Sequence, residues 1–379
     1  MKKKKRLVIL LLGAVLLAGV IAAGCGSSAP SDAVNKAIQN SSTVKSEHAD
    51  YNIVLDVTGD ASALPAQYRG LLPLHLSIGG GADIDISGQN NPKAQGDVKL
   101  GGLDKIISSL EQAQGTSSME SQLGAGIVSS LASDIQFVML NHTLYVKLAG
   151  NWYQEPLPAT PSGGSGALTT TSVNTSCYSN EFKDTSKYGA STIFKDLTDA
   201  GTQTINGTST HHYTANINFD ALLTQLAGTA RDCGNASAAG GLEAAKGEIG
   251  NVFKTASVDM WIGDDNNFHQ IKLNLQLDPS TVADLLGSLS SGAGSSEQQG
   301  QNILKAINSV ALTVTLTQSK INGSFTINKP QGNIQNLSDL GGTLGLGGAS
   351  GGTSSGGSSG GAGGTTTLPP NSGTGTGSQ

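Results

Sequence analysis

The chain has 379 residues, a formal net charge of -6, 4% aromatic side chains and only 13% charged side chains. Five positive charges lie at the extreme N-terminus, so the rest of the chain is more acidic, at about -11, and it shows no basic patch; we therefore expect no nucleic-acid partner. About 310 residues lie between the N-terminal leader and a low-complexity tail, which is enough for one large domain or two small ones.

The N-terminus predicts an export signal. Residues 2–6 are basic, and an uncharged apolar run from Leu7 to Ala23 follows them. An apolar run of this length behind a basic segment is typical of a signal peptide rather than of a spanning helix.

Cys25 follows Ala22-Ala23-Gly24, and this order resembles a bacterial lipobox, although Ala22 stands where Leu is more usual. The resemblance implies that residues 1–24 are removed and that the Cys25 sulfur receives a diacylglyceryl group, with palmitate as the expected acyl chain. Residues 25–31 would then be a short tether at the extracytoplasmic face of the cell membrane. A plain secreted chain and an uncleaved anchor are the alternatives.

Two further cysteines, Cys177 and Cys233, lie in segments rich in Ser, Thr, Asn and Gly. In an exported chain such a pair favours a disulfide over a metal site or a nucleophile. The bond would close a loop of about 57 residues and stabilise the domain by roughly 3 to 4 kcal/mol on the chain-entropy model.

The first half of the chain predicts one short helix followed by strands. Asp32 to Ser42 has helical spacing, with Ser31 or Asp32 as the cap and Val34, Ala37 and Ile38 on one face. Alternation of apolar and polar residues then predicts strands over 51–57, 74–86 (with glycines at 79–81), 94–100, 135–140, 144–148 and 152–154. Helical spacing at 103–114 and 119–132 marks an insertion at about 103–132, and a second, low-complexity insertion spans about 156–189.

The second half of the chain shows the same pattern of short helices and paired strands. Short helices are predicted over 191–197, 219–227, 242–253 and 279–290. Strands are predicted over 202–205 and 208–217 across Asn206-Gly207, over 256–262 and 271–277 across residues 263–267, and over 310–316 and 321–327 across Ser319-Lys320. Residues 341–379 are rich in Gly, Ser and Thr and predict a disordered tail.

These elements predict an α+β fold. One large, curved, mostly antiparallel sheet would form a half-barrel that wraps central α-helices gathered on its concave face.

Several sequence segments resemble the LppX/LprAFG family of actinobacterial lipoproteins, which is related in fold to the lipoprotein carrier LolA. They are the lipobox, the short helix and the strand SEHADYNIVLDVTGD, and then QNNPKAQGDVKL, FVMLNHTLYVKLAGNWYQ, INGTSTHHYTANIN and VDMWIGDDNNFHQIKLNL. The resemblance covers about residues 31–330 and implies one lipid-binding domain over 32–335, with an apolar cavity between sheet and helices. It implies carriage of lipids or lipoglycans through the cell envelope, and it allows a membrane exporter as partner.

The apolar faces of the predicted helices are, as a set, the candidates for lining that cavity, although for any one of these residues ordinary core is the favoured interpretation. The candidates are Ile106, Ile107, Leu110, Ile127, Leu131, Leu222, Leu223, Leu226, Val282, Leu285, Leu286 and Leu289. Binding of long acyl chains needs no polar motif, because each buried methylene contributes about 0.8 kcal/mol.

No sequence pattern indicates catalysis or a cofactor. The six histidines are scattered, and His211 and His212 point to opposite faces of a strand, so we expect no metal site. Residues 264–267 lack the spacing of a calcium loop and fit a hairpin turn better. We therefore expect a non-enzymatic lipid carrier anchored in the cell membrane.

Three other functions remain open on the sequence. The first is an envelope sensor or interaction module with the same fold and no lipid cargo. The second is a hydrolase whose site lies in the insertions, and the third is a structural surface lipoprotein whose tail reaches into the wall.

Overall fold

The computed structural model describes residues 29–337, apart from residues 65, 89–90, 107, 109–134, 149, 158–188 and 281–305. The predictions for the lipobox cysteine, for Cys177, for the tail and for most of both insertions lie outside these residues.

In the N-terminal half, the labelled elements of the described residues are one helix, two 3-10 turns and six strands. They are α2 (Pro30–Ser41), β1 (Ser46–Gly59), η1 (Ala61–Ala63), η2 (Ala66–Leu71), β2 (Leu74–Asp85), β3 (Lys93–Gly101), β4 (Ile135–Leu140), β5 (Thr143–Leu148) and β6 (Asn151–Pro156). Residues 103–106 and 108 are helical, in agreement with the helix predicted from Leu103, and the other residues of that prediction lie outside the described part.

In the C-terminal half, the labelled elements of the described residues are three helices and six strands. They are α7 (Ala190–Ile193), β7 (Phe194–Ile205), β8 (Thr208–Ile217), α8 (Phe219–Asp232), α9 (Ala236–Val252), β9 (Phe253–Gly263), β10 (Phe268–Leu277), β11 (Ile307–Ser319) and β12 (Ile334–Asn336). Of the helix predicted at 279–290, only residues 279–280 are described, and they are helical.

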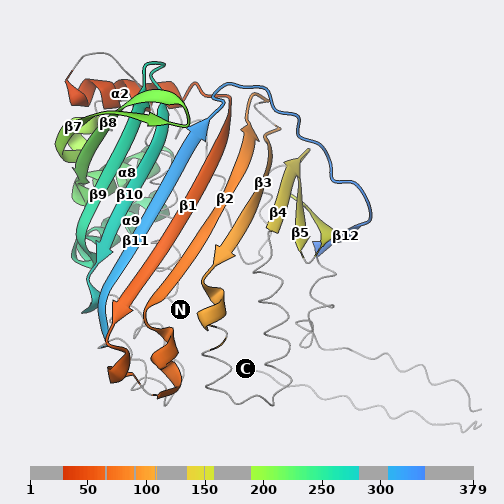
Figure 1. Cartoon of the computed structure of the whole chain (residues 1–379). Helices are drawn as coiled ribbons and strands as arrows, with labels where there is room; N and C mark the ends of the chain where they lie inside the picture. Colours follow the sequence, from red (N-terminus) through yellow and green to blue (C-terminus); the bar gives the residue numbers. More distant parts are fainter. Residues whose placement is uncertain are drawn as a thin grey trace, which may run out of the picture.

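All twelve of these strands form one open sheet, in the order β12-β6-β5-β4-β3-β2-β1-β11-β10-β9-β8-β7. Neighbouring strands are antiparallel except for β12 and β6, which run parallel. Figure 1 shows α8 and α9 on one face of the sheet, behind β8, β9 and β10. The α+β class, the large antiparallel sheet and the helices on one face agree with the fold expected from the sequence.

The two faces of the sheet differ because side chains alternate along each strand. On β10, Ile271, Leu273 and Leu275 are at most 4% exposed, whereas the residues between them are half-buried and polar. The apolar residues pack with α2, α7 and α8 into one core, in which Val258, Met260 and Ile262 of β9 are fully buried. We call the helix-bearing side the apolar face and the opposite side the polar face.

Helix α2 closes the core at the edge of the sheet. Ala33, Val34 and Ala37 are completely buried, so small side chains let the helix approach closely. The predicted cap was wrong: Ala29 precedes the helix without a side-chain hydrogen bond, and Pro30 occupies the first turn. Proline is suited to that position because it lacks only an N–H that has no helical partner there.

The helix predicted over 191–197 is also wrong beyond its first turn. Strand β7 begins at Phe194, which pairs with Ile217, and the β7–β8 ladder is irregular between Lys195 and Thr198. The irregularity lets Leu197 pack on the same core as Phe194. Apolar residues three apart therefore share one side of a strand, which imitates helical spacing.

The last predicted strand, at 321–327, is not formed. Strand β11 already has β10 and β1 on its two edges, so no edge is left for a hairpin partner. The chain turns at Ile321-Asn322, continues without regular structure and reaches β6 at the far edge of the sheet, where Ile334 lies opposite Trp152.

Candidate functional site

A single row of side chains crosses the apolar face through seven strands. Starting at β8 it contains Ala215, Val258, Leu273, Val314, Ile53, Ile78 and Leu100, each in register with the next. Exposure is 0% at Val258, 4% at Leu273 and 7% at Val314, but it reaches 42% at Ile78 of β2. The apolar face thus continues beyond the part that the core helices bury.

The same change is seen at the end of β2. Ile78 and Ile86 are the exposed large hydrophobic residues among those described; Ile78 lies on the apolar side of β2 by the alternation of its side chains, and Ile86 directly follows the last residue of that strand. In the described part, the strongest helix-to-strand contacts of α2, α7 and α9 are made with β7 and β9, at the other end of the sheet.

Four of the twelve cavity candidates fall within the described residues. Leu222 and Leu226 of α8 belong to or pack on the main core, Leu223 is buried, and Ile106 is half-buried near the start of its helix. The remaining candidates lie outside the described part; they are Ile107, Leu110, Ile127, Leu131, Val282, Leu285, Leu286 and Leu289. Cys233 follows the last turn of α8, and its pairing with Cys177 stays a prediction.

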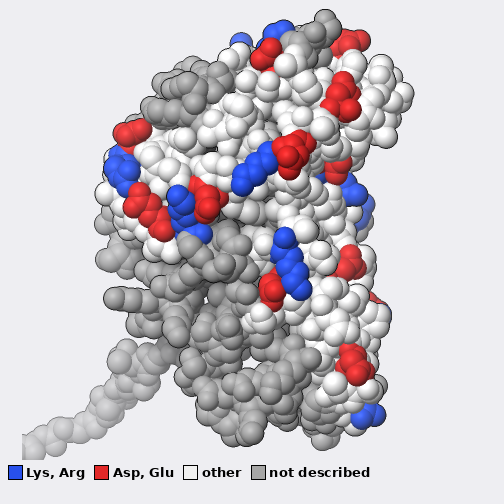
Figure 2. All heavy atoms as spheres, turned by 90° about the vertical axis from the view of Figure 1, so that its left-hand side faces the viewer, with Lys and Arg blue, Asp and Glu red and all other residues white. Residues whose placement is uncertain are grey.

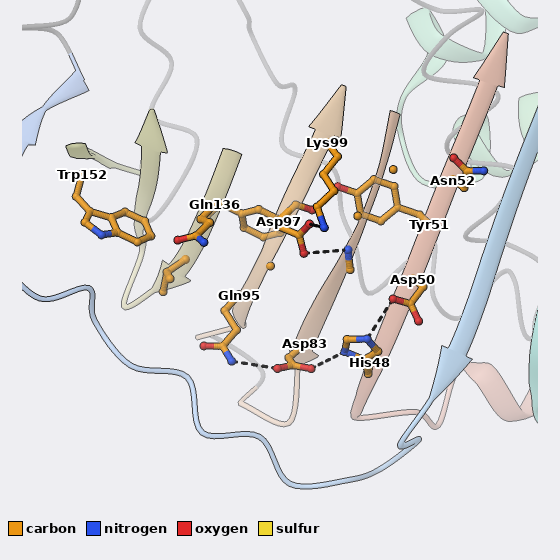
Figure 3. Close-up of a pocket in the computed structure, with 16 residues that line it drawn as sticks. His48, Asp50, Tyr51, Asn52, Asp83, Gln95, Asp97, Lys99, Gln136 and Trp152 are labelled. Carbon is orange, nitrogen blue, oxygen red and sulfur yellow. Dashed lines mark hydrogen bonds and ion pairs between the residues drawn. The ribbon is translucent and has the colours of Figure 1, made fainter. Parts of the chain in front are cut away.

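A hollow of about 740 Å³ lies on the polar face, over β1 to β4 and β6. Figure 3 shows its walls: His48, Asp50 and Asn52 project from β1, and Gln136 and Trp152 stand on the opposite side. Polar groups from strands far apart in the sequence therefore converge on one open depression.

The floor of this hollow consists of glycine. Gly79 and Gly81 face it, since a Cβ at Gly79 would lie 3.4 Å from Asn52 Oδ1 and one at Gly81 would lie 2.9 Å from Asp50 Oδ1. Gly80 points to the apolar face, where a Cβ would come within 1.9 Å of the Asp97 carbonyl oxygen. Gly80 is thus required by the neighbouring backbone, whereas Gly79 and Gly81 keep the hollow open.

His48 links two carboxylates at one end of the hollow. Its Nδ1 lies 2.7 Å from Asp83 Oδ1 and its Nε2 lies 3.3 Å from Asp50 Oδ1, while Gln95 Nε2 donates to Asp83 Oδ2 at 3.0 Å (Figure 3). The hydrogen bond to Asp83 raises the pKa of His48 against the opposing effect of burial. Burial raises the pKa of Asp83, but the hydrogen bonds from Gln95 and His48 outweigh it and hold that pKa below its usual value.

Asp97 stands in the middle of the hollow. Its Oδ2 forms an ion pair with Lys99 Nζ at 3.2 Å, and its Oδ1 accepts a 3.4 Å hydrogen bond from the Gly81 backbone N–H. The pairing of β2 with β3 is in register on both sides of this point, at Gly79 with Lys99 and at Ala82 with Gly96. In the middle of the sheet, the backbone N–H of Gly81 thus donates to the side chain of Asp97.

The polar hollow was not among the predicted sites. The sequence did contain a signal for it, because His48, Asp50 and Asn52 alternate with apolar residues on a strand that precedes three consecutive glycines. Alternation placed these side chains on one face, but it could not show that Gln95, Gln136 and Trp152 lie on the same face nearby.

Charged groups of both signs are interspersed on the side of the molecule that carries α8, α9 and β7 (Figure 2). Among the residues that the structure describes, no group of three His, Cys, Asp or Glu side chains is arranged to hold a metal ion. Nor does a helix in the described ranges combine the length and apolar character needed to cross a bilayer.

No family model matches the sequence. No curated protein matches it either.

Two mycobacterial structures match a large part of this chain. LprF from Mycobacterium bovis is 14% identical, with 77% of this chain and 91% of LprF covered at a TM-score of 0.31. The lipoprotein LppX from Mycobacterium tuberculosis is 14% identical, with 76% and 94% covered at a TM-score of 0.30. At these identities and TM-scores the likeness assigns neither a family nor a function.

Proposed function

We propose that this protein is a membrane-anchored lipoprotein that binds the acyl chains of a lipid or lipoglycan on the apolar face of its sheet and carries them through the cell envelope. The observation that supports the proposal is the exposure gradient along the seven-strand row. Val258 and Leu273 are buried, whereas Ile78 on the same face is 42% exposed.

An acyl chain suits such a surface because its binding depends on area rather than on directed polar groups. Burying the surface of Ile78 and its neighbours Ile53 and Leu100 would contribute about 25 cal/mol for each Å² removed from water. In this proposal the acyl chains lie on this part of the sheet, and the cavity candidates predicted from the sequence outside the described part would contribute further apolar contacts.

The proposal also includes attachment to the membrane and transfer of the lipid. Cys25 would carry the diacylglyceryl group after removal of residues 1–24, which would hold the domain at the extracytoplasmic face of the cell membrane. A membrane exporter would be a partner in transfer. The protein would perform no chemical step on its cargo.

The direct experiment is native mass spectrometry of the chain from Gly26 onward, purified without detergent, together with solvent extraction. We expect a stoichiometric lipid in the extract. A clean apo mass that also takes up no added phospholipid or glycolipid would contradict lipid binding and would favour the interaction module.

A matched pair of variants assigns the lipid to the apolar face. Ile78→Asp places a charge on that face and should reduce the lipid-bound fraction at least tenfold. Ser77→Asp places the same charge one residue earlier, on the polar face, and should leave the bound fraction unchanged. Equal loss in both variants, or in neither, would move the lipid away from this surface.

A further inference from the structure

The polar hollow has three properties of a binding site. Its volume of about 740 Å³ lies within the range of small-molecule pockets. Its side chains come from five strands of one rigid sheet. Its floor is open because Gly79 and Gly81, in the interior of a central strand, have no side chains, and glycine at such positions often marks the close approach of a ligand.

Neither the backbone conformation nor a close backbone contact explains why residues 79 and 81 are glycine. Neither residue has the positive φ that favours glycine, and a Cβ at either position would first meet the ends of β1 side chains rather than backbone. Glycine in a strand interior lowers β propensity. These two glycines therefore weaken the strand locally and provide space in front of the sheet.

The charge of the lining argues against an anionic ligand. Asp50, Asp83 and Asp97 supply three carboxylates, and Lys99 is already paired with Asp97. A phosphate or a nucleic acid would meet net negative charge here. The ligand should be neutral or cationic.

The hydrogen-bonding groups favour a neutral ligand with many hydroxyls. Carboxylates accept hydrogen bonds, and the carboxamides of Asn52, Gln95 and Gln136 both donate and accept. A hydroxyl likewise donates one bond and accepts others, so adjacent hydroxyls can be matched by such an array. Asp83 is held in place by His48 and Gln95, which lowers the cost of ordering the site on binding.

Trp152 adds a flat aromatic surface at the far wall (Figure 3), and Lys147 Nζ lies over the ring at 6.0 Å from its centroid. The face of an indole is electron-rich and attracts the positively polarised C–H groups on one side of a sugar ring. Carboxylates, carboxamides and an aromatic plane on one hollow together fit a saccharide. Because β1 and β6 are five strand positions apart, at about 4.8 Å each, the hollow is long enough for several sugar units.

We propose that the polar hollow between His48 and Trp152 binds a neutral oligosaccharide. The site lies on the face opposite to the helices, so this proposal does not depend on lipid binding. Trp152 stacks on a ring, and the carboxylates and carboxamides bond its hydroxyls.

Tryptophan fluorescence provides the test, because the chain has only two tryptophans, Trp152 and Trp261. Trp261 also lies in the sheet, but it stacks on His212 with the ring centroids 4.4 Å apart, away from the hollow. The mature chain would be titrated with soluble neutral oligomers of hexoses, pentoses and N-acetylated amino sugars, and also with spermine and a heparin fragment. Calorimetry would give the dissociation constants.

We expect at least one neutral oligosaccharide to bind and to change the fluorescence of wild type and of Trp261→Phe. Trp152→Phe should weaken binding at least tenfold. Gly81→Val, which fills the hollow, should do the same, whereas Thr315→Val on the polar face of β11 should not. Melting curves would establish that each variant is folded, and Ile78→Asp should leave sugar binding intact.

Binding of spermine or heparin with no sugar bound would overturn the proposal, as would a panel in which nothing binds. So would a sugar that binds folded Trp152→Phe and Gly81→Val as tightly as wild type. None of these outcomes bears on the lipid extract, so the two proposals fail separately.

Discussion

The hydroxyl of Tyr51 on β1 crosses strand β2 and donates a hydrogen bond to the backbone carbonyl of Asp97 on β3, at 2.9 Å. The crossing is possible because Tyr51 lies opposite Gly80, which has no side chain to obstruct it. Three neighbouring strands are thus joined by one side chain on the face behind the polar hollow. Burial, together with the nearby Asp97 carboxylate, raises the pKa of this phenol.

Gly80→Ala should therefore destabilise the protein more than Gly79→Ala. The new methyl at Gly80 would lie 1.9 Å from the Asp97 carbonyl oxygen and 2.8 Å from the Tyr51 hydroxyl, whereas at Gly79 the nearest atom is 3.4 Å away. Overpacking of this kind costs about 1–3 kcal/mol. Urea unfolding of both variants checks this, and an equal cost at the two positions would contradict it.

The His48–Asp83 pair should make stability depend on pH. The raised pKa of His48 adds stability that is fully present below its ordinary value of 6.5 and is lost as the pH rises through the folded-state value. The lowered pKa of Asp83 adds stability that is present above 3.8 and is lost as the pH falls. The pair should stabilise the fold most between these limits.

Thermal melts of wild type and His48→Gln at pH 5.5 and pH 8.5 measure the histidine part. The melting temperature of the wild type should exceed that of the variant by more at pH 5.5 than at pH 8.5. His75→Gln is the control, because His75 forms a similar contact with Asp56 but is 60% exposed. A wild-type advantage that is equal at both pH values would refute the assignment.

Glu47 lies on the apolar side of β1, where burial raises its pKa despite a hydrogen bond from Gln318. Because the folded-state pKa is raised, protonated Glu47 contributes stability that is fully present below pH 4.5, its ordinary pKa. This stability is lost as the pH rises through the folded-state pKa. Glu47→Gln should therefore raise the melting temperature at pH 7 and leave it nearly unchanged at pH 3.5. Calorimetry of the wild type and the variant at the two pH values tests this prediction. A lower melting temperature of Glu47→Gln at pH 7 would contradict the raised pKa of Glu47.

Truncation of isoleucine should cost less where the apolar face is exposed. Ile271→Ala removes a side chain that is 3% exposed in the core, and it should cost about 2–5 kcal/mol. Ile78→Ala, at 42% exposure, should cost less than half of that in lipid-free protein. Bound lipid should increase the cost at Ile78 alone, as chemical denaturation with and without lipid would show.

The predicted Cys177–Cys233 disulfide can be tested by peptide mapping. Digestion without reductant should release one peptide pair that joins the two cysteines, and Cys233→Ser should lower the free energy of unfolding by roughly 3 to 4 kcal/mol. Two separate peptides that both carry free thiols would refute the pairing.

The sequence by itself determined the elements whose signals are local. Alternation along the chain defined most strands, and Asn206-Gly207 forms the expected turn because both residues adopt positive φ. The hairpin of β9 and β10 was predicted in the same way. Each of these features depends on residues close together in the chain, so short-range conformational preferences suffice to specify it.

Only the tertiary structure decided which strands became neighbours. The sequence could not show that β1 lies between β2 and β11, which leaves no edge of β11 for residues 321–327. Nor could it bring His48, Asp83 and Trp152 to one hollow, since they come from three strands and the insertion at about 103–132 separates Trp152 from the other two. Strand order depends on burial of a shared apolar face and on pairing between distant segments, and neither leaves a periodic signal in the chain.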